Sequence, residues 1–487
     1  MSFTALTGVQ GGGYNRAAAL GHCTADSCEE EEAMGFVERR FQVSERGSTV
    51  GREVLGGLTT FMALSYIIFV QPAMMSDAGV PVAGAFVATC VASAIACVLM
   101  GLLANYPIAL APAMGHNAFF TYAVVLGMGF TWQQGLAAVF IGGCVFVVLS
   151  FVGFRAKIME FIPDSLKRGI AGGIGLLITF IGLQYAGVVV GSLATGITFG
   201  SVAAPPTLLA MFGLAVMLVL LARGTRGAVL WGIVATTVLG VVISLAGRPV
   251  LDLELNRYAS LNPGRSLLKL DFGGLFSARG ALTVVLTFLF LDVFDTVGTL
   301  IGVSERAGLL DAEGRLPRAR WALFSDASGT VIGAAMGTST ITSYIESAAG
   351  VQAGARTGLA NMVTAGLFVV SIVLYPILGV VASSHLYSEN GFIIRQYPVL
   401  APALIVVGSM MLKSLSRLNW EDATEFLPAF LTVVVMPLTM SITEGIAFGF
   451  IAYSILKFAT GRWRDVHWAF HVLSAVLVLR YALGLTS

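Results

Sequence analysis

Three acidic residues lie inside long apolar stretches of the sequence. Asp292 and Asp295 occur in FLFLDVFDTVGTL, and Glu346 occurs in TSYIESAAG. If these stretches cross a membrane, each charge costs roughly 2.5–3.5 kcal/mol on insertion scales, so charges kept there generally serve a function. We therefore take the three carboxyl groups as candidate site residues. Two further acids, Asp326 and Glu444, lie closer to predicted helix ends or small-residue turns.

Asp292 and Asp295 are three residues apart, so on a helix they share one face. Two carboxylates on one face inside a membrane repel each other, and at least one needs a proton or a hydrogen-bond partner. A carboxyl group that can be neutralised in this way is suited to proton coupling. We expect Asp295 to face a ligand, and Asp292 to tune proton coupling or hold the helix. The alternative is that one aspartate caps a broken helix or bonds Thr296 or Thr299.

Glu346 and Asn117 offer complementary hydrogen-bonding groups. Glu346 follows a Thr/Ser-rich, non-helical opening, and its carboxylate can accept two parallel hydrogen bonds from a planar ligand with adjacent N–H donors. We also assign it to proton coupling; its alternative role is that of a helix N-terminal acid favoured by the helix dipole. Asn117, in APAMGHNAFF, carries a donor and an acceptor, which suits the mixed edge of a purine. The alternative for Asn117 is a helix-breaking cap.

His116 directly precedes Asn117, and imidazole titrates near neutral pH. It could therefore modulate proton coupling, or it could simply pack. Phe119, Phe120 and Tyr122 follow on the chain and could supply an aromatic face for a base or serve as ordinary core residues. The sequence leaves both alternatives open for these four side chains.

The composition places these residues in a membrane protein. Of the 487 residues, 56% are hydrophobic and 11% are charged, against roughly 25% charged in an average soluble domain. The net charge of +1 gives no sign of nucleic-acid binding, and the five cysteines form no metal or disulfide pattern. No HExxH, GxSxG or Walker motif occurs in a suitable context, so we expect no enzyme and no bound cofactor or metal. The glycine-rich GIAGGIG (Gly169–Gly175) opens an apolar block and favours close helix packing.

The apolar blocks are each near the ~20 residues that span a bilayer. They predict an all-α polytopic membrane protein with fourteen spans, at 55–76, 82–104, 107–128, 132–153, 169–190, 205–222, 227–246, 281–303, 321–336, 338–354, 359–382, 398–412, 424–439 and 442–458. With the N-terminus in the cytoplasm, 22 of the 28 Lys and Arg residues lie inside, as the positive-inside rule requires. Both termini are then cytoplasmic, in a plasma or bacterial inner membrane.

The two ends of the chain differ from the spans. Residues 1–50 are polar, Gly-rich and acidic, so we expect a disordered cytoplasmic tail. Residues 461–487 contain a last apolar stretch that His467, His471 and Arg480 interrupt. This pattern favours an interfacial helix over a fifteenth span.

Fourteen spans divide into two halves of seven, and two halves with an odd number of spans have opposite orientations. This is the inverted-repeat plan of many secondary transporters. The third span opens with Pro107 and Pro112, and the tenth opens with Gly, Thr and Ser residues. Both openings disfavour regular helix. Interrupted spans in matching positions of the two halves point to a transporter's binding site.

At these motifs the chain resembles the AzgA-type adenine/guanine/hypoxanthine permeases, a branch of the nucleobase–cation symporter-2 group. The resemblance covers about residues 50–480 and rests on GGLTTFMALSYIIFVQP, APAMGHNAFF, FLFLDVFDTVGTLIGV and GTSTITSYIESAAGVQAGARTGL. It implies proton-coupled import of hypoxanthine, guanine and adenine. Matched by motif, the family's functional residues fall on Asn117, Asp292, Asp295 and Glu346.

The resemblance also implies an architecture. Two interlocked seven-span repeats would form a core domain, about 51–154 and 281–382, and a gate domain, about 163–247 and 397–460, within a transporter domain at 51–460. Short extended segments in spans three and ten would meet at the substrate site. A homodimer through the gate domains is implied by family analogy alone.

Three positions depart from the family pattern. Ala113 stands where a Gly is usual, His116 where a Leu is usual, and Gln71 where an Asn is more usual. Because His116 adjoins Asn117, the purine preference and pH dependence are left open. The alternatives are a xanthine- or uracil-type symporter, against which DVFDTVGT and TSYIES argue, and an anion transporter of the same fold. Three carboxylates at a site disfavour an anion, because fixed negative charge repels it.

Overall fold

The computed structural model describes residues 35, 37–152, 163–248, 250–251, 253, 263–309, 311, 316–389 and 392–482. Most of the predicted N-terminal tail lies outside these residues. Residues 37–49, which the prediction placed in the tail, contact the helices instead. The side-chain amide of Asn105 donates to the carbonyl of Phe41 (2.8 Å), and Arg46 donates to the carbonyl of Asn105 (2.8 Å).

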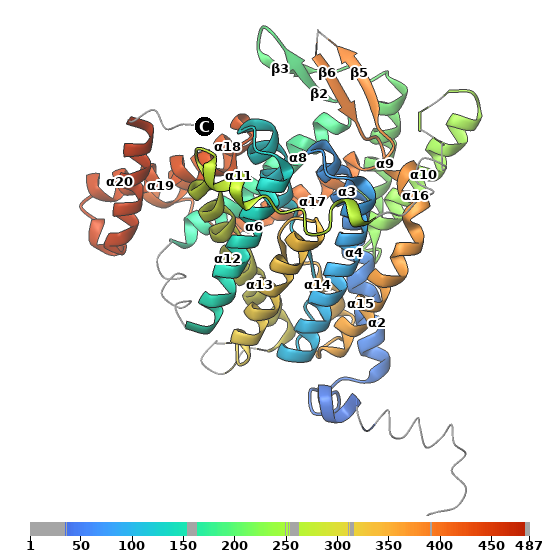
Figure 1. Ribbon diagram of the computed structural model, residues 1–487, viewed down its shortest axis with the longest axis horizontal. Coiled ribbons are helices and arrows are strands. Elements are labelled where there is room, and N and C mark those ends of the chain that lie inside the picture. The colour runs from blue at the N-terminus through green and yellow to red at the C-terminus, as the bar shows by residue number, and fades with distance from the viewer. Residues whose placement is uncertain are drawn as a thin grey trace, which may run out of the picture.

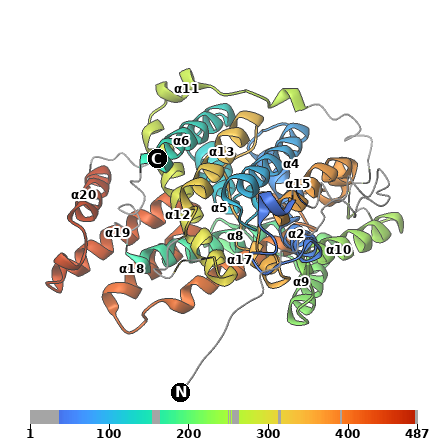
Figure 2. The same cartoon turned by 90° about the horizontal axis from the view of Figure 1, so that it is seen from below.

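The helices pack mainly within two groups, which Figures 1 and 2 show from two sides. The first group contains α2 (Val50–Leu64), α3 (Ile67–Asp77), α4 (Val82–Leu99) with the π-helix η1 (Met100–Ala104), α6 (Trp132–Val152), α12 (Ala281–Ala307), α13 (Ala319–Met336), α14 (Ser347–Gln352), α15 (Leu359–Val370) and α16 (Tyr375–Val381). The second group contains α8 (Asp164–Tyr185), α9 (Pro205–Ala222), α10 (Ala228–Leu245), α17 (Ala401–Met411), α18 (Ala423–Thr439), α19 (Ile442–Ala459) and α20 (Trp468–Ala482). Apart from α20, which follows the predicted gate, the helices of the two groups lie in the sequence ranges assigned to the core and the gate, respectively; the division into these two domains stays a prediction.

The long helices match a membrane protein in length and composition. Within the described residues, nine helical stretches are long and apolar enough to cross a membrane. The fourteen predicted spans fall on helices, or on a strand followed by helix in spans three and ten; the number of spans stays a prediction. The first predicted span is divided at Ser65 and Tyr66 into α2 and α3, a break that the sequence did not predict.

The glycine-rich start of α8 allows close packing within the second group. A Cβ added to Gly169 would lie 2.9 Å from the Cα of Ala429, in α18. One added to Gly175 would lie 2.7 Å from the carbonyl oxygen of Gly408, in α17. Any larger residue would push these helices apart, so the prediction that GIAGGIG serves helix packing is confirmed.

Two β-hairpins mark one face of the molecule, which we call the hairpin face (top of Figure 1). Strand β2 (Val189–Ser192) pairs with β3 (Gly196–Phe199), and β5 (His385–Glu389) pairs with β6 (Phe392–Gln396).

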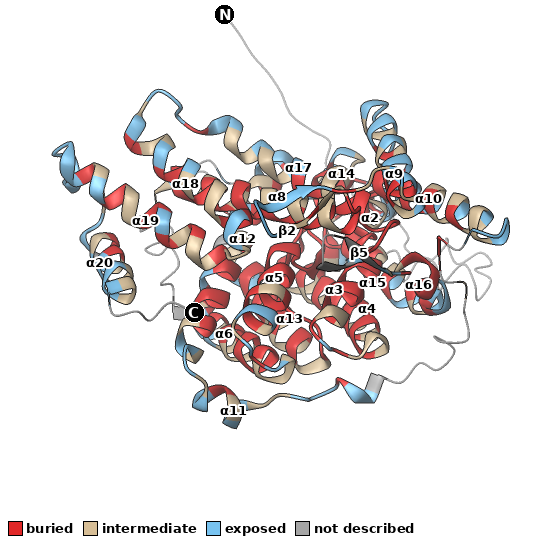
Figure 3. Cartoon of the chain, turned by 90° about the horizontal axis from the view of Figure 1, so that it is seen from above, coloured by how far each residue is buried: buried red, intermediate tan, exposed pale blue. Residues whose placement is uncertain are grey.

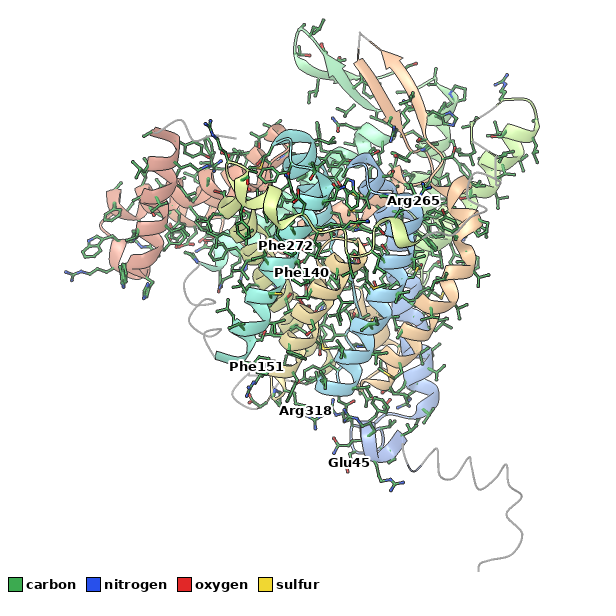
Figure 4. All side chains as sticks on the ribbon, viewed as in Figure 1. Glu45, Phe140, Phe151, Arg265, Phe272 and Arg318 are labelled. Atoms are coloured by element: carbon green, nitrogen blue, oxygen red, sulfur yellow. The ribbon has the colours of Figure 1, made fainter. Side chains whose placement is uncertain are left out.

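The short helix α11 (Phe272–Ser277) packs on α6, where the rings of Phe272 and Phe140 lie 5.8 Å apart (Figure 4).

The outer surfaces of several helices are apolar and exposed, as Figure 3 shows for α9, α10 and α18–α20. Leu218 in α9, Val238 in α10 and Phe430 in α18 are each about half exposed. Such surfaces suit contact with lipid rather than water.

Helix α20 runs antiparallel along α19. The rings of Phe450 and Phe470 lie 4.8 Å apart, and the hydroxyl of Ser454 donates to Ser474 (2.8 Å). Further along, Arg480 pairs with Glu444 (2.7 Å). This packing does not define the position of residues 461–487 relative to the bilayer, so the interfacial helix stays a prediction.

Candidate functional site

Two short strands cross at the centre of the first group. Strand β1 (Leu110–Pro112), from the third predicted span, pairs antiparallel with β4 (Ile341–Ser343), from the tenth, with Ala111 opposite Thr342. Two backbone hydrogen bonds extend the ladder, from the N–H of Ala113 to the carbonyl of Thr340 and from that of Tyr344 to Ala109, each 2.9 Å. The predicted extended segments in spans three and ten are therefore confirmed.

A short helix follows each strand. Helix α5 (Met114–Ala118) continues β1 and runs on into the π-helix η2 (Phe119–Gly127), while α14 begins directly after Glu346. The chain is extended where Pro112 interrupts the helical bonding, because proline has no N–H to donate. Asn117 and Glu346 thus lie on the two segments that the crossing brings together.

Asp326, on α13, holds strand β4 in place. Its carboxylate accepts hydrogen bonds from the backbone N–H and the hydroxyl of Ser343, both 2.8 Å, and from the hydroxyl of Thr296 on α12 (2.6 Å). The side chain is fully buried. Sequence reasoning set Asp326 aside as a residue near a helix end, although its place inside an apolar span carried the same signal as the other acids.

Asp292 is also buried and faces α13 rather than an opening. The hydroxyl of Thr330 lies 3.0 Å from Asp292 Oδ2 and 2.8 Å from the backbone carbonyl of Ile341 in β4. A hydroxyl has one proton to donate, so these two acceptors compete for it. Asp292 Oδ1 has no hydrogen-bond partner among the described residues.

Unlike Asp292 and Asp326, Asp295 and Glu346 are each half-buried. Asp295 lies on α12, which packs against α14, the helix that begins directly after Glu346. The hydroxyl of Tyr66, at the break between α2 and α3, donates to Glu346 Oε1 (3.1 Å). Sequence reasoning missed Tyr66, because a tyrosine in an apolar span gives no signal by itself. The pair offers carboxylate oxygens to a ligand beside the strand crossing.

Asn117 is buried and its carbonyl oxygen is already occupied. The hydroxyl of Ser339, just before β4, donates to this oxygen. Gln71 Nε2 in turn donates to Thr338 Oγ1 (2.8 Å) and lies 3.3 Å from Ser339 Oγ. Among the described residues, the amide nitrogen of Asn117 has only the sulfur of Met114, 3.9 Å away, as a partner. Its N–H donors are therefore only weakly bonded in this part of the structure.

His116 is 1% exposed, and neither ring nitrogen has a hydrogen-bond partner among the described residues. Its neighbour Gly115 lies close to α8, where an added Cβ would come 2.6 Å from a side-chain methyl of Ile174. This environment is the one expected if His116 only packs against its neighbours. A role of His116 in proton coupling stays a prediction.

The aromatic residues after Asn117 do not line the crossing. The rings of Phe119 and Phe120 pack against Phe288 of α12, with centroids 4.9 and 6.5 Å apart. Tyr122 is hydrogen-bonded at the hairpin face. The nearest aromatic groups to Glu346 are Tyr66 and Tyr344, whose hydroxyl donates to the carbonyl of Pro112. The core alternative therefore fits Phe119 and Phe120.

Comparison with known proteins gives both a fold and a family. The transmembrane domain of the cyanobacterial bicarbonate transporter BicA aligns with a TM-score of 0.61 at 15% identity, covering 80% of this chain and 96% of that one, which shows the fold. The guanine/hypoxanthine permease PbuG of Bacillus subtilis is 44% identical over 91% of this chain and 98% of its own length. The adenine permease AdeP of Escherichia coli K12 is 40% identical over 93% and 97%.

These relatives confirm the resemblance to adenine/guanine/hypoxanthine permeases and the prediction of a multi-pass membrane transporter rather than an enzyme. The sequence profile of the Permease family matches residues 51–448. Since this match takes in both interrupted spans and all four motif-matched residues, the chain belongs to the Permease family.

Proposed function

We propose that this protein is a secondary active transporter that imports the purine bases hypoxanthine, guanine and adenine in symport with protons. Relatives similar over almost their whole length carry the names of adenine and guanine/hypoxanthine permeases. The observation that carries the proposal is the grouping of Asp295, Glu346 and Asn117 around the crossing of β1 and β4.

The chemistry of this site fits an uncharged planar base. Asp295 and Glu346 offer acceptors for ring and exocyclic N–H groups, and the Asn117 amide offers donors for a carbonyl or ring nitrogen. The Asn117 carbonyl oxygen accepts from Ser339, on the opposite segment, while its amide nitrogen carries the two donors. The site thus has both kinds of partner that the mixed edge of a purine requires.

Proton coupling is assigned to Asp292 and Glu346, with His116 as a modulator. Asp292 is buried against Thr330 and β4, so a change in its protonation would alter the contacts that hold the crossing. In this proposal the first helix group moves as a core against the second as a gate. Both termini face the cytoplasm of a cell-membrane protein, and the gate domains can form a homodimer.

An anion transporter of the same fold is the other candidate, since BicA is named a bicarbonate transporter. A likeness at 15% identity concerns the fold alone. Asp295 and Glu346 place negative charge where an anion would have to bind, which disfavours it. A xanthine- or uracil-type symporter remains the alternative within the nucleobase carriers.

The test is uptake of radiolabelled hypoxanthine by cells that lack their own purine permeases and express this chain. We expect guanine and adenine to compete and a protonophore to abolish accumulation. If only xanthine or uracil competed with hypoxanthine uptake, the substrate assignment would change to a xanthine- or uracil-type symporter. Accumulation that persists with the protonophore would contradict proton coupling but would leave the assignment of purine bases as substrates intact.

A further inference from the structure

A single carboxylate at the hairpin face accepts three hydrogen bonds. Asp77, the last residue of α3, accepts at Oδ2 from the hydroxyl of Tyr185 (2.6 Å), which in turn lies 2.5 Å from the hydroxyl of Tyr122. Its Oδ1 receives the guanidinium of Arg395 and the hydroxyl of Tyr397, both at 2.9 Å. We call these five residues the Asp77 cluster.

The cluster joins the two helix groups. Asp77 and Tyr122 belong to the first group, through α3 and η2. Tyr185 ends α8 of the second group, and the N–H of Tyr397, on the segment leading to α17, donates to its backbone carbonyl (3.0 Å). Arg395 lies on β6 of the hairpin above, at the top of Figure 1. The Asp77 carboxylate is therefore a direct link between parts that must separate if the groups move.

Two cavities flank the cluster. One, of about 400 Å³, is lined by Asp77, Tyr122, Gln184, Tyr185 and Arg395 together with the first residues of β2. The other, of about 320 Å³, lies between η2, α12 and the turn from α18 to α19. Tyr122 lines both cavities, so its side chain and its hydrogen bonds separate the space on one side from that on the other.

We propose that Asp77 is a gating residue, whose hydrogen bonds hold the two helix groups together at the hairpin face and so keep this face closed. Hydrogen bonds to an ionised carboxylate are roughly twice as strong as those between neutral groups. Three of them on one side chain give the closed arrangement a free-energy advantage, which opening on this face must overcome. In the predicted orientation, the hairpin face is the outer face of the membrane.

The geometry separates this role from that of an ordinary surface ion pair. The Asp77 side chain is 12% exposed, while that of Arg395 is 45% exposed. The hydroxyls of Tyr185 and Tyr397 therefore supply most of the buried bonding to Asp77, and the hydroxyl of Tyr122 lies 2.5 Å from that of Tyr185. The rings of Tyr185 and Tyr397 also pack at 4.5 Å. Moving α8 away from α3 would break these contacts together.

The test measures the distance between the helix groups and needs no substrate. Spin labels are placed at Leu126→Cys in η2 and Leu193→Cys between β2 and β3, both exposed positions (57% and 89%), in a chain without its native cysteines. Electron–electron double resonance in lipid nanodiscs then gives the distance distribution. We expect one short distance in the otherwise unchanged protein. Asp77→Asn should raise the population of a longer distance about tenfold or more, because charge-assisted hydrogen bonds are lost.

Tyr185→Phe removes one hydroxyl and should act in the same direction to a smaller extent, about threefold to tenfold. It also carries the test if Asp77→Asn fails to fold. The matched control is Asp422→Asn, which breaks an ion pair to Arg462 (2.6 Å) at the start of α18, within the second group. Distributions that stay unchanged in both Asp77→Asn and Tyr185→Phe, or that change equally in the control, overturn the gating role. Neither result depends on which base is transported.

Discussion

The hydroxyl of Ser339 donates a hydrogen bond to the side-chain carbonyl of Asn117. These residues lie 222 positions apart, on the two interrupted segments that the β1–β4 crossing unites. With Ser339 donating to its carbonyl oxygen, the amide nitrogen of Asn117 keeps only a weak contact, with the sulfur of Met114, among the described residues. The position of the Asn117 side chain therefore depends on the opposite segment.

Removing the Ser339 hydroxyl should weaken substrate binding. Ser339→Ala frees the amide to rotate, and a lost hydrogen bond of this kind corresponds to ~1 kcal/mol. We expect the KM for hypoxanthine to rise about threefold to tenfold, with a smaller change in maximal uptake. Ser93→Ala is the control, since that buried hydroxyl has no hydrogen-bond partner among the described residues. Equal KM values for Ser339→Ala and the unchanged protein would mean that Asn117 does not bind the base.

Glu346→Gln should abolish or severely reduce uptake while the protein still reaches the membrane. An amide cannot keep both carboxylate acceptors, and loss of a charge-assisted bond costs ~1.5–3 kcal/mol, which is about tenfold or more. Tyr66→Phe leaves the carboxylate but removes its 3.1 Å hydrogen bond, so uptake should fall less, about threefold to tenfold. Uptake at the normal rate by Glu346→Gln would show that Glu346 is not part of the substrate site.

Several features of this site could be predicted from the sequence. The cost of a charge in an apolar span singled out Asp292, Asp295 and Glu346 without any structure. The prolines of the third span and the Gly, Thr and Ser residues of the tenth predicted interruptions of regular helix where β1 and β4 lie, and the family resemblance implied that these segments are extended. These signals are local, because each depends on neighbouring residues alone.

The features that escaped prediction depend on contacts between distant residues. Tyr66 meets Glu346 across 280 positions, and nothing in FMALSYIIF indicates that the helix breaks at Ser65 and Tyr66. Asp326 is bonded to Thr296 and Ser343, which lie on two other elements. A single sequence contains no information on which of its polar residues pair at such separations, so the bonding that holds the site required the structure.

The two aspartates of α12 should differ in role. Asp295 is half-buried beside Glu346, whereas Asp292 is 2% exposed and bonded to Thr330. We expect Asp295→Asn to lose hypoxanthine binding, and Asp292→Asn to bind the base but to transport it poorly or with altered proton coupling. Binding by purified protein is measured separately from uptake in cells. Normal binding by Asp295→Asn together with lost binding by Asp292→Asn would reverse the assignment.

His116→Leu should shift the pH profile or the purine preference of uptake without stopping transport. The imidazole adjoins Asn117, titrates near neutral pH in its free form, and stands where the family usually has leucine. Uptake of hypoxanthine, guanine and adenine is compared from about pH 5 to about pH 8, with His471→Leu in α20 as a control remote from the crossing. An unchanged profile for every base would assign His116 to packing, which its burial without hydrogen-bond partners already favours. Complete loss of transport in a folded variant would also contradict the prediction that His116 only modulates transport, because the imidazole would then be an essential proton carrier.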